Sequence, residues 1–238
     1  KSFQFNTTPG IRFGAEESIN SAAEVSKKLG KNILFVTDPG LVKIGLIDDT
    51  LAALRSHSDV LVFDNVEADP SLKTLMKCVE VGSDFNTTGV IGFGGGSSMD
   101  VSKLTALIIG SKEDIHEAWG VAKAKGPRLP LALYPTTSGT GSEVTPISII
   151  TQDDQEKKGV SSPIILPDLA ILDPLLTLGL PPHTTAATGI DAMVHAIESY
   201  ASKGKNNNLI SKSLAKEALK LLGSSISKAV SDGKDLDA

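Results

Sequence analysis

The feature that most constrains the fold is the glycine cluster Gly92-Phe93-Gly94-Gly95-Gly96, which directly follows a short apolar run. The run GVIGF (89–93) is typical of a buried strand, and the residues after Ser97 have helical periodicity. Consecutive glycines remove the Cβ atoms that would keep a ligand away from backbone N–H groups. A strand, a glycine-rich turn and a helix in this order predict a seat for a pyrophosphate group.

The glycine spacing differs from the usual dinucleotide fingerprint, because G-x-G-x-x-G would need glycine at Ser97. An alternative is a tight strand–helix turn in which Ser97 is the N-cap and Asp100 closes a capping box. The two interpretations are compatible, since a capped helix can also hold a phosphate.

Short apolar runs alternate with helical patterns along most of the chain. The predicted strands are Ile33–Thr37, Val60–Phe63, Gly89–Phe93, Leu131–Tyr134 and Leu169–Leu172. The predicted helices between them are Ala15–Leu29, Gly40–Leu54, Leu72–Asp84 and Ser98–Ile109. This alternation predicts an α/β fold with a Rossmann-like parallel sheet that is covered on both faces.

The pattern changes at Pro181-Pro182, and only helical periodicity follows, over 184–201 and 207–230. We therefore expect an α/β domain over residues 1–180. Residues 181–238 are expected to be the beginning of an all-helical domain.

Composition excludes several classes of function. The net charge is -5 and no run of Lys or Arg stands out, so a nucleic-acid partner is not expected. No stretch approaches the roughly 18 apolar residues of a membrane helix. The single cysteine, Cys78, cannot form an internal disulfide, which fits a cytoplasmic protein. Its apolar surroundings favour a small core residue over a reactive thiol.

A second polar loop follows the strand LALY and Pro135. Its residues from Thr136 to Ser142 are all hydroxyl residues or glycine, which suits contacts with phosphate, ribose or a carboxamide. An ordinary polar loop is the alternative. Asp38 ends another strand, where a carboxylate accepts hydrogen bonds from ribose hydroxyls and repels a 2'-phosphate, favouring NAD over NADP. The alternative is an N-capping acid in the turn Asp38-Pro39-Gly40.

Asp191 and His195 are four residues apart in a predicted helix, so their side chains share one face. A carboxylate and an imidazole so placed can chelate Fe²⁺, Zn²⁺ or Mn²⁺, although two ligands rarely suffice. Glu198 is a candidate for orienting the imidazole. The alternative is a surface pair of little energetic weight. His183 is interpreted as a loop or capping residue.

Three segments in a fixed order carry a resemblance to a known family. GGGSSMDVSK (94–103), PTTSGTGSEVT (135–145) and ATGIDAMVHAIESY (187–200) together resemble the iron-containing, or group III, alcohol dehydrogenases. The run LPDLAILDPLLTLGLPPHTTAATG (166–189) is also similar, so the resemblance covers essentially the whole chain. It implies a dehydroquinate synthase-like fold, in which an α/β nucleotide-binding domain precedes a helical domain.

The resemblance also implies roles for individual residues. Asp191 and His195 would be two of four metal ligands, with Fe²⁺ favoured, and two further histidines are expected on helices after Ala238. Lys158 matches a lysine that reaches the cofactor ribose, with a plain loop lysine as the alternative. The expected NAD contacts, with NADP possible, are Asp38, Gly94, Gly95, Gly96, Ser97, Asp100, Thr136, Thr137, Thr140, Ser142, Thr145 and Lys158.

The implied activity is reversible hydride transfer between an alcohol and a nicotinamide, with a metal polarising the oxygen of the alcohol, aldehyde or ketone. The resemblance further implies a cytoplasmic homodimer without nucleic-acid or membrane partners. One alternative is a dehydroquinate synthase-like lyase that uses NAD and a metal. The other is a nucleotide-binding fragment without catalytic activity.

Overall fold

The computed structural model describes residues 2–238 and divides them into two compact units. The α/β unit consists of Thr7–Thr136 and Ser142–Asp173. The helical unit consists of the segment up to Asn6, Thr137–Gly141 and Pro174–Ala238. The expected domains, 1–180 and 181–238, differ from these units in their bounds.

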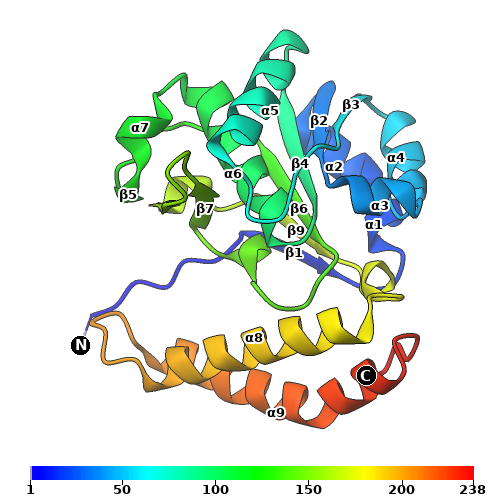
Figure 1. Cartoon of the computed structure of the whole chain (residues 1–238), viewed down its shortest axis with the longest axis vertical. Helices are drawn as coiled ribbons and strands as arrows, with labels where there is room; N and C mark the ends of the chain where they lie inside the picture. Colours follow the sequence, from blue (N-terminus) through cyan, green and yellow to red (C-terminus); the bar gives the residue numbers. More distant parts are fainter. Residues whose placement is uncertain (1) are drawn as a thin grey trace. The chain divides into compact units, whose positions relative to one another are not determined.

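A six-stranded sheet forms the centre of the α/β unit (Figure 1). Every neighbouring pair of its strands is parallel, and the order is β1-β9-β6-β4-β2-β3. β4 and β6 are buried at every position, which explains their continuous apolar sequence. The strands are β1 (Gly10–Phe13), β2 (Asn32–Val36), β3 (Asp59–Phe63), β4 (Gly89–Gly94), β6 (Leu131–Pro135) and β9 (Leu169–Leu172).

Helices cover the sheet on both faces. α2 and α6 both contact β4 and β6. A Cβ at Gly89 of β4 would meet Leu29 of α2, and one at Gly92 would meet Ser102 of α6. Because strand positions three residues apart point to opposite faces, the two helices cover opposite faces of the sheet. The predicted α/β fold class is confirmed. The helices of this unit are α1 (Glu17–Asn20), α2 (Ala22–Leu29), α3 (Pro39–Lys43), α4 (Asp48–Arg55), α5 (Leu72–Asp84), α6 (Gly96–Ser111) and α7 (Ile115–Ala118).

Two predicted helices are each broken in two. Ser21 separates α1 from α2, and its Oγ donates a 2.6 Å hydrogen bond to the carbonyl oxygen of Glu17. Gly45 lies between α3 and α4 with a φ of 71°, which most side chains disfavour. The predictions of continuous helices over 15–29 and 40–54 are therefore wrong at these two points.

The sequence analysis also missed strands. A three-stranded sheet has the order β5-β8-β7 and packs through β7 against α6. β7 alternates exposed and buried residues, which is the sequence signal of a half-buried strand. Its strands are β5 (Gly120–Val121), β7 (Ile147–Thr151) and β8 (Lys157–Ser161), and the unit also has 3-10 turns η1 (Ser142–Val144) and η2 (Pro163–Ile165).

The direction of the chain through the sheet reverses between β2 and β4. From β2 the chain moves outward to the edge strand β3, and from β4 it moves the opposite way to β6 and β9. Parallel α/β sheets bind ligands at the carboxyl ends of the strands that flank such a reversal. Here those ends carry Asp38, just after β2, and Gly94, the last residue of β4.

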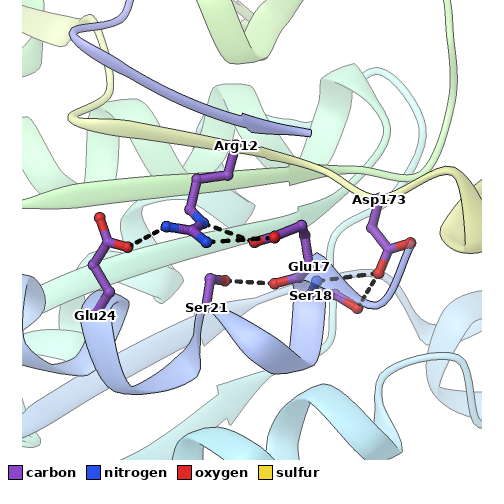
Figure 2. A network of polar contacts seen from close by, with 6 residues as sticks. All are labelled: Arg12, Glu17, Ser18, Ser21, Glu24 and Asp173. Atoms are coloured by element: carbon purple, nitrogen blue, oxygen red, sulfur yellow. Dashed lines mark hydrogen bonds and ion pairs between the residues drawn. The ribbon is translucent and has the colours of Figure 1, made fainter. Parts of the chain in front are cut away.

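Polar side chains fasten β1 and β9 to the first helices (Figure 2). Arg12 of β1 donates 2.7 Å hydrogen bonds to Glu17 and to Glu24. Asp173, buried directly after β9, accepts from the backbone N–H of Ser18 at 3.1 Å and from its hydroxyl at 2.6 Å. These contacts attach α1 and α2 to the β1–β9 side of the sheet.

Cys78 of α5 is fully buried in the core of the α/β unit. Burial raises the pKa of its thiol to about 12. The interpretation of Cys78 as a core residue is therefore confirmed, because a thiol with this pKa supplies almost no thiolate near neutrality.

The helical unit contains two long helices, α8 (Pro182–Ala201) and α9 (Leu209–Ser231), and the 3-10 turn η3 (Pro174–Thr177). The two helices pack closely, and a Cβ at Gly189 would lie 2.6 Å from Ile226 of α9. Asn208 begins α9 with a capping box completed by Ser211. Within residues 2–238, no helix combines the length and the hydropathy that crossing a membrane requires.

Candidate functional site

The glycine turn connects β4 directly to α6. Gly94 has a φ of 144°, and a Cβ at this position would lie 2.8 Å from the hydroxyl of Ser98. Gly95 is the N-cap, and no side chain caps the first turn of α6. The amides of Gly96 and Ser97 therefore begin the helix without acceptors inside it. The alternative in which Ser97 is the N-cap is wrong, because Ser97 lies within the first turn.

This open turn fits a phosphate group. The N–H donors and the positive end of the helix dipole favour an anion, and Gly95 has no side chain to compete for the donors. Gly95, Gly96 and Ser97 are half-buried, whereas Gly94 is buried in the turn itself. Gly94 is thus required by the backbone conformation of the turn, whereas Gly95 leaves the first-turn amides accessible to a ligand.

The polar loop begins beside the glycine turn. Gly94 and Pro135 are register partners in β4 and β6, and the amide of Thr136 donates to the carbonyl oxygen of Gly94 at 3.0 Å. Two elements that are far apart in the sequence are therefore adjacent at this edge. The start of the polar loop, at Thr136, therefore lies beside the glycine turn.

The middle of the polar loop, Thr137–Gly141, belongs to the helical unit. There a Cβ at Gly139 would lie 2.8 Å from the side chain of Thr188 and 3.0 Å from its carbonyl oxygen, so this contact with α8 requires glycine. Thr137 is half-buried and Thr140 is exposed.

The loop returns to the α/β unit at Ser142, which is buried. Its hydroxyl donates to Oδ1 of Asp100 at 2.9 Å, and the other carboxylate oxygen of Asp100 accepts from the amide of Ile149 at 2.9 Å. Asp100 therefore binds η1 and β7, and its predicted role in a capping box is wrong. Burial raises the pKa of Asp100, and the nearby ammonium of Lys103 opposes that rise. Thr145 follows η1 and is half-buried.

Sequence reasoning missed Lys103, which among residues 2–238 is the one lysine or arginine that is fully buried. Its side chain is fully buried, and Nζ donates 2.7 Å hydrogen bonds to the Ser142 hydroxyl and the Ile147 carbonyl oxygen. Burial lowers the pKa of Lys103 to about 8, against the opposing effects of Asp100 and Glu143. The available signal was a single lysine within the otherwise apolar run of α6, where a helix surrounded by core leaves no route to solvent.

Asp38 is the N-cap of α3. Its Oδ1 accepts from the amides of Gly40 at 2.9 Å and Leu41 at 3.1 Å, so the predicted capping role is confirmed. Among residues 2–238, no hydrogen bond reaches the other oxygen, Oδ2. Capping and a contact with a ribose are thus compatible, since each uses a different oxygen. A Cβ at Gly94 would lie 3.4 Å from Leu41, which places the start of α3 beside the glycine turn.

Lys158 lies on β8, opposite Ile150 of β7. The interpretation of Lys158 as a loop lysine is therefore wrong. Its Nζ is 3.5 Å from Oε2 of Glu156 and its side chain is partly exposed. The contact of Lys158 with a ribose stays a prediction.

Asp191 and His195 face one another on α8. Oδ1 of Asp191 is 3.6 Å from Nε2 of His195, and about half of each side chain is exposed. Within residues 2–238, no group of three or more His, Cys, Asp or Glu side chains is arranged to hold a metal. The pair fits two ligands of a divalent cation, because a carboxylate and an imidazole are suitable donors. His183 lies in the first turn of α8 and is not part of the pair.

Sequence comparison places this α/β architecture and its glycine turn in a known family. Residues 8–174 match the family described as iron-containing alcohol dehydrogenase, and residues 185–238 match the C-terminal part of the Fe-containing alcohol dehydrogenase family. The chain belongs to the iron-containing alcohol dehydrogenase family.

Individual relatives agree with this assignment. The chain is 44% identical to long-chain-alcohol dehydrogenase 1 of Geobacillus thermodenitrificans over 89% of this chain and 54% of that protein. The structure of an alcohol dehydrogenase from Oenococcus oeni has a TM-score of 0.93 and 34% identity, over 99% of this chain and 62% of that one.

A third relative was solved with a nucleotide. Sulfoacetaldehyde reductase from Bifidobacterium kashiwanohense, in complex with NAD+, has a TM-score of 0.90 and 31% identity, over 100% of this chain and 63% of that chain. The chain thus spans between about half and two thirds of the length of these relatives.

Proposed function

We propose that the protein is a metal-dependent, NAD-linked alcohol dehydrogenase that interconverts an alcohol with an aldehyde or ketone by hydride transfer. The observation that carries this proposal is the uncapped first turn of α6, which begins at the reversal point of the sheet. Membership of the iron-containing alcohol dehydrogenase family supports the reaction class.

The proposed cofactor site is built on the carboxyl ends of β2, β4 and β6. The pyrophosphate lies on the amides of Gly95, Gly96 and Ser97, where no side chain competes for the donors. Oδ2 of Asp38 accepts from the ribose hydroxyls, and its charge favours NAD over NADP. Thr136, Thr137, Thr140, Ser142, Thr145 and Lys158 complete the proposed set.

Asp191 and His195 hold the proposed metal, with Fe²⁺ as the first expectation and Zn²⁺ or Mn²⁺ as alternatives. Two ligands rarely suffice for a divalent cation, so we expect further ligands besides this pair. When bound, a divalent cation supplies a Lewis acid that polarises the substrate oxygen. The chain's own contribution is to hold the nicotinamide and the substrate in the geometry for hydride transfer, because such positioning lowers the entropic part of the barrier. The cytoplasmic location and the lack of a nucleic-acid partner stay predictions.

The names of the relatives indicate the class of substrate but no single compound. They include a long-chain-alcohol dehydrogenase, a sulfoacetaldehyde reductase and a 1,3-propanediol dehydrogenase. The test uses the protein from its complete reading frame, purified with Fe²⁺ and assayed for NADH formation with a panel of short, long and diol alcohols.

Turnover of at least one alcohol, dependent on the metal, is the expected result. A lyase on the same scaffold would return its NAD unchanged, so binding of NAD without net NADH would support that alternative. Protein that binds NAD, retains no metal and oxidises no alcohol would support the role of a nucleotide-binding fragment.

The proposed oligomeric state is a homodimer. β1 is an edge strand of the six-stranded sheet, and Ile11 and Phe13 on this strand are 52% and 77% exposed. An open edge with exposed apolar side chains is a surface that proteins commonly cover. Sedimentation of the Phe13→Asp variant is expected to show dissociation toward monomer, whereas an unchanged assembly would exclude this edge as the interface.

A further inference from the structure

Lys103 carries a positive charge into the interior of the α/β unit, where its buried side chain is not among the predicted contacts of NAD or of the metal. Its side chain is fully buried, and such burial is costly unless the ammonium is hydrogen-bonded and close to negative charge. Nζ has both forms of compensation: the Ser142 hydroxyl and the Ile147 carbonyl oxygen lie at 2.7 Å, and Oδ1 of Asp100 lies at 4.0 Å.

The contacts of Lys103 and Asp100 join three separate segments of the α/β unit. Both side chains come from α6, and they bind Ser142 of η1 and the backbone of β7 at Ile147 and Ile149. The hydroxyl of Ser148 on β7 adds a 3.0 Å hydrogen bond to the carbonyl oxygen of Asp100.

Ser142 is held in one orientation by this arrangement. An ammonium can only donate and an ionised carboxylate can only accept. The Ser142 hydroxyl accepts from Lys103 and donates to Asp100, so these two contacts fix the direction of its hydrogen. A hydroxyl placed between two such groups is a rigid attachment point for the chain that carries it.

The two ends of the polar loop are fixed in different ways. At the amino end, the backbone N–H of Thr136 donates to the carbonyl oxygen of Gly94, a contact that does not depend on the side chain of Thr136. At the carboxyl end, the attachment depends on the side chains of Ser142, Asp100 and Lys103. A substitution at Lys103 therefore removes one of the side-chain contacts that hold the carboxyl end of the loop and leaves the glycine turn in place.

We propose that Lys103 is a positioning residue that sets the carboxyl end of the hydroxyl-rich loop against α6, so that the loop can receive the nicotinamide half of the dinucleotide. This inference rests on the proposed function. Lys103 acts through Ser142 and does not touch the cofactor. The pyrophosphate seat at Gly95–Ser97 is independent of it, because that seat consists of backbone amides at the start of α6.

The test compares two nucleotides in the protein from its complete reading frame. ADP covers the pyrophosphate seat alone, whereas NAD extends from that seat to the loop. Isothermal titration of Lys103→Met should give about tenfold weaker binding of NAD, the size of one lost hydrogen bond to a charged group, and ADP binding within about twofold of the original. A general loss of protein stability would weaken the binding of NAD and of ADP equally, and that outcome would overturn the inference.

Two further variants sharpen the comparison. Lys112→Met is the matched control, because Lys112 ends the same helix and is exposed, and it should leave both affinities unchanged. Ser142→Ala should reproduce the selective loss of NAD affinity, and the double variant with Lys103→Met should add little, as expected for two residues that act through one contact.

Should Lys103→Met not fold, Ser142→Ala carries the test, and an unchanged ratio of NAD to ADP affinity in that variant overturns the proposal. If the unsubstituted protein binds neither nucleotide, the proposed function fails and this inference fails with it. If the unsubstituted protein binds both and the variants keep NAD affinity, only the positioning role is refuted.

Discussion

Nε2 of His195 lies 3.6 Å from Oδ1 of Asp191, one turn earlier on the same face of α8. Both side chains are about half exposed, so this pair adds little to stability as an ion pair. Two potential ligands at this separation on one helix face are instead suited to a shared cation.

We therefore expect Asp191→Ala and His195→Ala to lose bound metal while keeping NAD affinity. The measurement is elemental analysis of the purified protein together with nucleotide titration. His183→Ala is the matched control, because it removes an imidazole from the first turn of the same helix. Metal content in His195→Ala equal to that of the control would refute the ligand assignment.

The two glycines of the turn are expected to respond differently to substitution. Gly94→Ala should destabilise the fold by about 1–3 kcal/mol, because the backbone has a positive φ and the new Cβ would meet Ser98. Gly95→Ser should keep or slightly raise stability, by a few tenths of a kcal/mol, since serine is a favourable N-cap.

The same Gly95→Ser variant should bind NAD more weakly. Its hydroxyl would accept hydrogen bonds from the first-turn amides, which are the donors proposed for the pyrophosphate. Thermal unfolding and nucleotide titration of both variants separate the two effects. An unchanged NAD affinity in a stable Gly95→Ser protein would place the cofactor elsewhere.

Asp38→Asn separates the two roles of the carboxylate. Asparagine keeps an oxygen that can cap α3, so stability should change by less than about 0.5 kcal/mol. The negative charge is lost, and use of NADP relative to NAD should therefore improve several-fold. The ratio of kcat/KM values for the two cofactors is the measurement. If that ratio does not change, Asp38 is a capping residue only.

The pKa of Lys103 predicts a specific dependence of stability on pH. Burial lowers it from 10.5 to about 8, so between these pH values the unfolded chain binds more protons than the folded one. Stability should therefore rise with pH across this window, by up to about 3 kcal/mol from this group. The rise should be absent in Lys103→Met.

The difference in unfolding free energy between the two proteins, measured from pH 8 to pH 10, isolates this contribution. The carboxyl groups that face Lys103, Asp100 of α6 and Glu143 of η1, are present in both proteins. A difference that stays constant across the window would show that Lys103 keeps an ordinary pKa.

The sequence predicted the parallel sheet because its central strands are buried on both faces and read as continuous apolar runs. It also predicted the capping role of Asp38, which depends only on neighbours two and three residues away. The break at Ser21 was missed because the helical spacing of apolar residues continues across it, although α1 and α2 are separate helices.

The unforeseen parts of the site depend on contacts between distant residues. Asp100 was expected among the NAD contacts, with a capping box at its own helix terminus as the alternative. Its carboxylate binds Ser142 and Ile149 of later segments. The role of Lys103 was missed for the same reason, because its hydrogen-bond partners lie about forty residues further along the chain. No local pattern records such pairings, because they arise only when β7 packs against α6.

The pairing of β1 with β9 has a consequence for how the chain reaches its final form. Gly10 is the register partner of Leu169, so β1 cannot pair with β9 until nearly the whole α/β unit has been translated. This contact between residues far apart in the sequence is made late, after the central strands have met. Until then the backbone N–H and C=O groups of β1 have no strand to pair with, and translation speed and chaperone access during that interval will affect the yield of folded protein.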